Sequence, residues 1–178
     1  MNFDVIGPVK VERFGAKRLI NQESLDQIGL ALENDFDGIT NACGCYIFAV
    51  KSARGVTPWY VGQANKQALV REALNPSNRG KYNDVLQNEY EKGTPVLYFL
   101  PLVTPGGKYA KPTTTESGRE SIHFFEDWLI ASSLRKNPSL YNIRKTAFLR
   151  GLHVTGIFGA GQGEGTKSSL SLRKTLGL

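Results

Sequence analysis

The sequence Gly44-Cys45-Tyr46-Ile47-Phe48 and, after a short gap, Trp59-Tyr60-Val61-Gly62 decides how the rest of this chain folds. Each stretch is short, apolar and rich in aromatic and β-branched residues, and turn-forming residues bound it, which predicts two strands. The gap over 51–57 contains a glycine and precedes a proline, so we expect a hairpin loop there. The two tyrosines would then lie on neighbouring antiparallel strands.

The remaining hydrophobic pattern predicts further strands and helices on both sides of this hairpin. Apolar residues at helical spacing predict helices, and a continuous apolar run of five residues predicts a central strand. We expect strands over 3–6 and 9–12 with a turn at Gly7-Pro8, helices over 24–33, 66–74, 82–92, 116–134 and 168–176, the central strand over 96–100, and a loop over 104–115. Asn65 is expected to cap the helix over 66–74, and Asn75-Pro76 to end it, with a polar loop between it and the helix over 82–92.

The composition is typical of a globular domain. The chain has 178 residues, of which 40% are hydrophobic and 21% charged, which allows one domain with a full core. No apolar run approaches the ~20 residues of a membrane helix, and the N-terminus lacks the form of a signal peptide. Cys43 and Cys45 suit neither a disulfide framework nor a tetrahedral metal site, so we expect two buried thiols in a reducing, cytoplasmic protein without a membrane partner.

The charge of the chain is unevenly distributed. The net charge is +6, and residues 128–178 hold eight Lys or Arg against a single Glu, whereas residues 1–40 hold four against seven acidic residues. A basic C-terminal third suits contact with phosphates. Because many ordinary proteins are equally basic, charge alone favours a nucleic-acid partner only modestly.

Glu126 is the most informative single residue. On a helix, its neighbours three and four positions away are Ile122, His123, Leu129 and Ile130, which places its carboxylate at the border of the apolar stripe. A carboxylate there needs a partner, which a divalent cation or an arginine would supply. Periodicity alone favours a salt bridge or a solvated edge residue over a metal ligand.

Five elements in order resemble the GIY-YIG nuclease family. Gly44-Cys45-Tyr46 and Tyr60-Val61-Gly62 are similar to its two naming motifs, and Arg71 stands on the helix that follows them. Glu126-Asp-Trp-Leu129-Ile130 is similar to its Glu-x-x-Leu-Ile pattern, and Asn142 follows a proline and an aromatic residue, as in the family. The resemblance covers residues 42–145. It implies an α+β fold with a small, mainly antiparallel sheet flanked by helices.

The resemblance also implies an activity, hydrolysis of DNA phosphodiester bonds, and a role for each matched residue. Glu126 would hold one Mg²⁺ or Mn²⁺, which binds oxygen ligands and keeps several waters. Arg71 would contact the phosphate, and Tyr46 would orient the attacking water or take its proton. Tyr60 would orient the water or the phosphate, and Asn142 would hold the site together. Since an ordinary tyrosine pKa is near 10, a base role for Tyr46 requires a cation that lowers it.

Each of these residues also has an ordinary structural interpretation. Without the resemblance, both tyrosines would be structural. Lys51, Arg54, Lys66 and Lys167 could contact a DNA backbone, but each is more often a solvated surface charge. Trp59 and Trp128 are expected in the core. The Gly-rich tail over 159–168 is no Walker A loop, because Thr166 rather than glycine precedes Lys167, and we expect a flexible linker.

The sequence therefore predicts an endonuclease, with a non-catalytic nucleic-acid-binding module on the same scaffold as the alternative. We expect an N-terminal extension over 1–40 packed on the domain, a nuclease-like domain over 41–147, and a basic, Gly-rich tail over 148–178. DNA is the expected partner, and a second copy of the chain or a partner protein would supply specificity that such short extensions do not.

Overall fold

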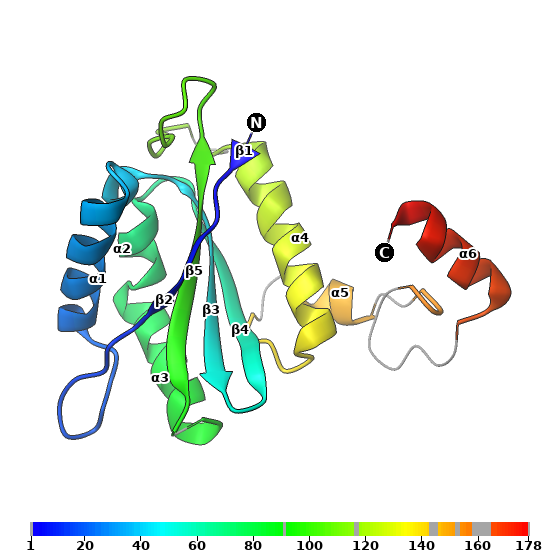
Figure 1. The fold of residues 1–178 in the computed structure, drawn as a ribbon, viewed down its shortest axis with the longest axis horizontal. Helices are drawn as coiled ribbons and strands as arrows, with labels where there is room; N and C mark the ends of the chain where they lie inside the picture. Colours follow the sequence, from blue (N-terminus) through cyan, green and yellow to red (C-terminus); the bar gives the residue numbers. More distant parts are fainter. Residues whose placement is uncertain are drawn as a thin grey trace.

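The protein is an antiparallel sheet covered by helices on both faces (Figure 1), which confirms the predicted α+β class. The computed structural model describes residues 2–90, 92–115, 118–142, 146–151, 154–157 and 165–177. The sheet has the strand order β1-β5-β3-β4, and β2 pairs with β5 as well. Its strands are β1 (Asn2–Phe3), β2 (Ile6–Lys10), β3 (Gly44–Ser52), β4 (Gly55–Ala64) and β5 (Thr94–Val103).

The hairpin β3–β4 is the centre of the sheet's pairing, and it is longer than the sequence suggested. Its turn consists of Ala53 and Arg54 alone, so the loop expected over 51–57 is wrong. The flanking residues pair instead: Lys51 lies opposite Val56, and the β-branched Val56 and Thr57 suit a strand. A register shift between Phe48 and Ala49 leaves Trp59 without a partner residue on β3, as in a β-bulge.

The two motif glycines are required by close packing within this sheet. Gly44 has φ +157°, and a Cβ on it would overlap the backbone oxygen of Leu100 on β5. Gly62 lies opposite Tyr46 in the ladder, and a Cβ on Gly62 would overlap the Tyr46 ring. Because the glycine of the second motif has no side chain, the tyrosine ring of the first motif can pack at that position.

The sheet separates two hydrophobic clusters. The first lies under α1 (Gln22–Asp35), α2 (Leu69–Ala73) and α3 (Pro76–Asn88) and contains Tyr46 and Phe48, whose ring stacks on Tyr82 with 3.9 Å between centroids. The second lies under α4 (Glu120–Lys136) and contains Cys43, Cys45 and Val61. Both cysteines are fully buried thiols that form no disulfide, as expected from the sequence.

The N-terminal residues complete the sheet and the first cluster. Both β1 and β2 lie along the same edge of β5, and Ile28 and Leu32 of α1 are core residues. The expected turn at Gly7-Pro8 is wrong, since both residues belong to β2 at a register shift against β5. The helix expected over 24–33 is confirmed as α1, which begins with a capping box formed by Asn21 and Ser24.

The region between β4 and β5 differs most from expectation. Asn65 does not cap α2, which begins at Leu69 and has no side-chain cap. The preceding helix does end before Asn75-Pro76, as expected, since α2 ends at Ala73 with Leu74 as its C-cap. The same pair also opens α3, because the Asn75 side chain accepts a hydrogen bond from the Asn78 amide and Pro76 occupies the first turn. The helix expected over 82–92 therefore begins six residues earlier, and the segment expected to be a polar loop is its first turns.

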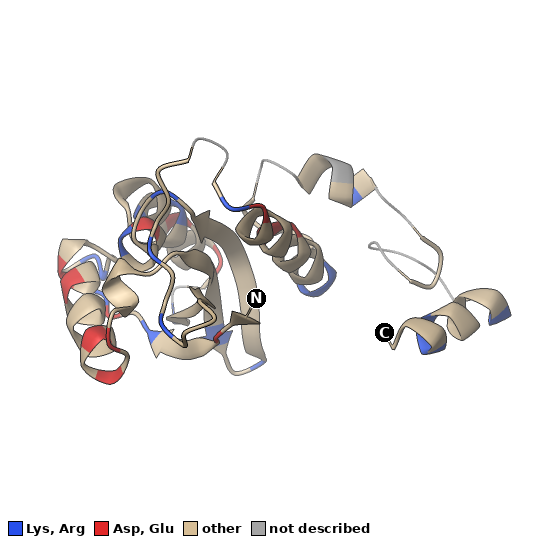
Figure 2. Cartoon of the chain, turned by 90° about the horizontal axis from the view of Figure 1, so that it is seen from above, with Lys and Arg blue, Asp and Glu red and all other residues tan. Residues whose placement is uncertain are grey.

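In the C-terminal part of the described chain, helices α5 (Thr146–Gly151) and α6 (Lys167–Leu176) follow α4. A 3₁₀ turn, η1 (Ile39–Asn41), precedes β3. The predicted helix over 168–176 is confirmed as α6, and its charged residues are all basic, in contrast to the acidic residues on α1 (Figure 2). The helix expected over 116–134 is α4, which begins at Glu120. Most of the Gly-rich linker, residues 158–164, lies outside the described residues.

We predict that Gly62→Ala lowers the free energy of unfolding by about 1–3 kcal/mol, since the new methyl group must displace the buried Tyr46 ring. Urea denaturation measures the change. Gly29→Ala in α1 is the matched control, because nothing beyond the adjacent residues and the helix's own backbone lies within 4 Å of its new Cβ; it should stabilise the protein by up to ~1 kcal/mol. Equal effects of the two substitutions would contradict the packing argument.

Candidate active site

The two motif tyrosines lie on the same face of neighbouring strands, as expected. Tyr46 comes from β3 and Tyr60 from β4, their ring centroids are 6.3 Å apart, and both pack in the cluster under α2 and α3. Tyr46 is 1% exposed, whereas Tyr60 is only partly buried. Only the Tyr60 hydroxyl is therefore within easy reach of a molecule on the surface.

A lysine and an asparagine from α3 join the two hydroxyl groups. Asn78 Nδ2 donates a hydrogen bond of 2.8 Å to the Tyr46 hydroxyl, and Lys81 Nζ donates one of 2.9 Å to Asn78 Oδ1. Lys81 Nζ also lies 3.2 Å from the Tyr60 hydroxyl and 4.4 Å from the centroid of the Tyr60 ring. The four side chains form one connected group, which we call the tyrosine–lysine cluster.

Sequence reasoning missed Asn78 and Lys81. It treated their segment as a loop, because Asn-Pro after a helical pattern was interpreted as a stop signal. The same dipeptide is also a start signal, with asparagine as the cap and proline in the first turn. On a helix, residues three apart share a face, so a helix that starts at Pro76 brings Asn78 and Lys81 together.

The environment of Tyr46 raises its pKa well above the usual value. Burial is the main cause, and the neighbouring Tyr82, Tyr60 and Glu72 add to it, while the hydrogen bond from Asn78 opposes it. Tyr46 is therefore a neutral phenol at physiological pH. The condition for a base role, a lowered pKa, is not met in the free protein, and Tyr46 instead holds Asn78 in place.

Arg71 is not brought to the tyrosines. Arg71 is exposed on α2 and lines a hollow beside α1. Asp26 and Glu33 of α1 line the same hollow. No ion pair among the described residues includes Arg71. The structure therefore places Arg71 against α1 rather than in the tyrosine–lysine cluster.

Asn142 holds the outer edge of β4. Its Oδ1 accepts a hydrogen bond of 2.9 Å from the Val61 amide, and its Nδ2 donates one of 2.7 Å to the Val61 carbonyl. The Tyr141 amide donates to the Trp59 carbonyl, and Asn137 Nδ2 to the Pro58 carbonyl. The segment after α4 thus pairs with a sheet edge that would otherwise be open.

Glu126 lies half-buried on α4. One turn earlier on the same face, His123 Nε2 lies 3.3 Å from Asn65 Nδ2. Asn65 also binds the start of α4, accepting from the Arg119 amide at 2.9 Å. These contacts fix the first turns of α4 against the end of β4.

A cavity of about 230 Å³ lies between α2, the end of β4 and the start of α4. Glu72, Gln63 and His123 line it, and the buried Gln63 Oε1 has no hydrogen-bond partner. Oxygen donors of this kind suit Mg²⁺ or Mn²⁺. Glu126 does not line the cavity, and within the described part of the chain no three His, Cys, Asp or Glu side chains gather as a metal site.

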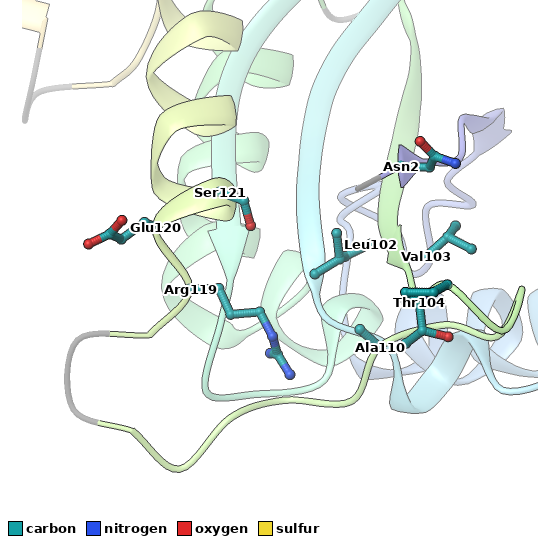
Figure 3. Close-up of a pocket in the computed structure, with 9 residues that line it drawn as sticks. Asn2, Leu102, Val103, Thr104, Ala110, Arg119, Glu120 and Ser121 are labelled. Atoms are coloured by element: carbon teal, nitrogen blue, oxygen red, sulfur yellow. The ribbon is translucent and has the colours of Figure 1, made fainter.

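A second hollow, of about 660 Å³ and mostly apolar, lies where the end of β5 meets the start of α4 (Figure 3). Leu102, Val103, Ala110 and Arg119 contribute to its wall, and Arg119 Nη1 donates to Cys43 Sγ at 3.2 Å. None of the predicted site residues lines it, so it is separate from the tyrosine–lysine cluster.

The predicted backbone contacts are all exposed but scattered. Lys51 ends β3, Arg54 forms the hairpin turn, Lys66 lines the 230 Å³ cavity, and Lys167 begins α6. Of the two tryptophans, Trp59 is buried as expected. Trp128 is 56% exposed and stacks on Phe125, so its assignment to the core is wrong.

Searches against family models, curated proteins and solved structures found no match to this chain. Among the helices the structure describes, none is long and apolar enough to span a membrane.

We predict that Asn142→Ala lowers the free energy of unfolding by about 1–3 kcal/mol, because it leaves the buried amide and carbonyl of Val61 without partners. Chemical denaturation provides the measurement. Asn88→Ala, at the exposed end of α3, is the control and should change stability little. If the two variants unfold at the same denaturant concentration, Asn142 does not hold the edge.

We predict that Tyr46 titrates well above pH 10 in the folded protein. Its pKa is raised on folding, so its stabilising contribution is complete below the unfolded value of ~10 and is lost as the pH rises through the folded value. The free energy of unfolding should fall above about pH 10, and less so in Tyr46→Phe.

Absorbance of the ionised phenols, followed as the pH is raised, checks this directly. The protein has seven tyrosines, and burial also raises the pKa of Tyr82 well above its usual value. Tyr46→Phe and Tyr82→Phe should each remove one late-titrating phenol. Titration of all seven near pH 10 while the protein stays folded would refute the prediction.

Proposed function

We propose that this chain is a metal-dependent endonuclease of the GIY-YIG type that hydrolyses DNA phosphodiester bonds. The observation that carries the proposal is the tyrosine–lysine cluster, in which the tyrosines of both motifs lie on one face of the hairpin and connect to a fixed ammonium group. Gly62 supports it, since its missing side chain makes room for the Tyr46 ring.

The groups that can reach a DNA backbone come from Tyr60 and from α3. The Tyr60 hydroxyl is positioned to hydrogen-bond a phosphate oxygen or the attacking water. Tyr46 is buried and neutral, so it acts as a positioning residue: it fixes Asn78, which in turn fixes Lys81. The cluster thus presents one hydroxyl and one positive charge on a rigid support, as electrostatic stabilisation of a phosphoryl group requires.

In the proposal a divalent ion is held by Glu126 on α4, the helix that covers the opposite face of the sheet from the two tyrosines. Glu72 and the unpartnered Gln63 Oε1 are further oxygen donors, in the 230 Å³ cavity between α2, β4 and α4. A bound Mg²⁺ or Mn²⁺ would polarise the phosphate and stabilise the leaving oxygen. The contribution of the chain is to hold α4 against β4 through Asn65 and Asn142, so that the carboxylate keeps its place.

The alternative, a nucleic-acid-binding module without catalysis, is favoured by two specific observations. Tyr46 is buried with a raised pKa, and Arg71 lies beside α1. Such a module would bind DNA in a salt-sensitive manner and would not cleave it, whichever metal is added. In either case a second copy or a partner protein would contribute the specificity.

We predict that the protein nicks supercoiled plasmid in the presence of Mg²⁺ or Mn²⁺, and that Glu126→Gln lowers the rate by about 100-fold or more, since the ligand charge is lost. Glu120→Gln, an exposed position in the first turn of the same helix, is the matched control and should retain full activity.

DNA binding, measured by fluorescence anisotropy, separates the two functions. Metal-dependent cleavage that disappears only in Glu126→Gln supports the nuclease. Tight binding without cleavage by any form of the protein, on plasmid and on branched DNA, would establish the binding module instead.

A further inference from the structure

Lys81 is a half-buried cation that is held by neutral groups only. Its ammonium group donates to Asn78 Oδ1 and to the Tyr60 hydroxyl and lies over the Tyr60 ring. No ion pair within the described residues includes Lys81. An ammonium group has three N–H donors, and these two bonds leave one for a ligand.

The position of this ammonium group is fixed before any ligand binds. Asn78, which holds it, is 2% exposed and donates to both the Tyr46 hydroxyl and the Glu72 carbonyl, at 2.8 and 2.9 Å. A free lysine side chain loses much conformational entropy when it is ordered. Here the buried neighbours have already imposed that order, which is the arrangement expected of a binding group rather than of a solvated surface lysine.

The charge balance around Lys81 also favours an anion as its ligand. A positive charge that is partly removed from water is costly unless a negative group compensates it. No carboxylate of the described chain forms an ion pair with Lys81. Asp26 and Glu33 line the separate hollow beside α1, where the Glu33 carboxylate accepts from Gly38 and Thr40. The charge of Lys81 is therefore open to compensation by a ligand.

We propose that Lys81, and not Arg71, contacts the phosphate of the nucleic acid, by binding a non-bridging oxygen of a single phosphodiester next to the Tyr60 hydroxyl. This inference rests on the proposed function, because it assigns the cation of the same site. A lysine acts as a point charge and makes one contact, whereas an arginine would donate hydrogen bonds to two phosphate oxygens at once. The site therefore orients one phosphate group.

The test compares Lys81→Met with Arg71→Met, which removes the same charge from the neighbouring helix. Plasmid nicking should fall by about 100-fold in Lys81→Met and stay near wild type in Arg71→Met. Lys81→Arg should recover part of the activity, since it restores the charge. Circular dichroism and thermal unfolding verify that all variants are folded.

A second readout is independent of cleavage. The affinity for a short duplex oligonucleotide is measured at several salt concentrations with the metal omitted. Loss of one phosphate contact should reduce the slope of log affinity against log salt by about 0.9, and we expect this in Lys81→Met.

The two readouts separate failure of this inference from failure of the proposed function. If no form of the protein cleaves DNA but Lys81→Met still reduces the slope, the phosphate contact stands and the nuclease assignment fails. If cleavage is lost in Arg71→Met and kept in Lys81→Met, the inference is overturned. It is also overturned if Lys81→Met loses cleavage with an unchanged slope, because Lys81 would then only support Tyr60.

Discussion

The packing of the Tyr46 ring against Gly62 is the contact on which the rest of the site depends. Because position 62 has no side chain, the ring can lie across the neighbouring strand, and its hydroxyl reaches the first turns of α3. Asn78 then has a buried partner, and through Asn78 the position of Lys81 is determined. A change in this one strand-to-strand contact would propagate to the only cation in the tyrosine–lysine cluster.

The second constraint is the outer edge of β4. An edge strand exposes unpaired amides and carbonyls, and here the segment after α4 satisfies those of Pro58, Trp59 and Val61 with side chains and backbone. At the other end of the strand, Asn65 binds the start of α4. The helix that carries Glu126 is therefore tied to β4 at both ends. Its register relative to Tyr60 follows from hydrogen bonds that involve three asparagines, at positions 65, 137 and 142.

The sequence alone predicted the parts of this structure that have a periodic signal. The hairpin, the α1 helix and the central strand all show the expected alternation or helical spacing, and the motif residues Gly44 and Gly62 mark real close approaches. The predictions are incomplete or wrong where the same residues are compatible with two local structures. Asn75-Pro76 follows the end of α2, as predicted, and also starts α3, a second role that the prediction of a stop signal left out. Asn65 likewise looks like a cap, but its partner is Arg119, 54 residues away.

The same limitation explains why the cation was assigned to α2. A resemblance based on spacing along the chain points to the first basic residue on the helix after the second motif, which is Arg71. In space, however, the tyrosines face α3, and α2 has only five residues, about one and a half turns. On such a short helix, Leu69, Val70 and Ala73 are buried against the sheet. Position 71 is therefore left on the outside, toward α1. A positive charge beside Tyr60 must then come from the following helix, and on α3 the position one turn after the buried Asn78 is Lys81. The identity of this cation is a consequence of how long α2 is, and the linear motif contains no information about that length.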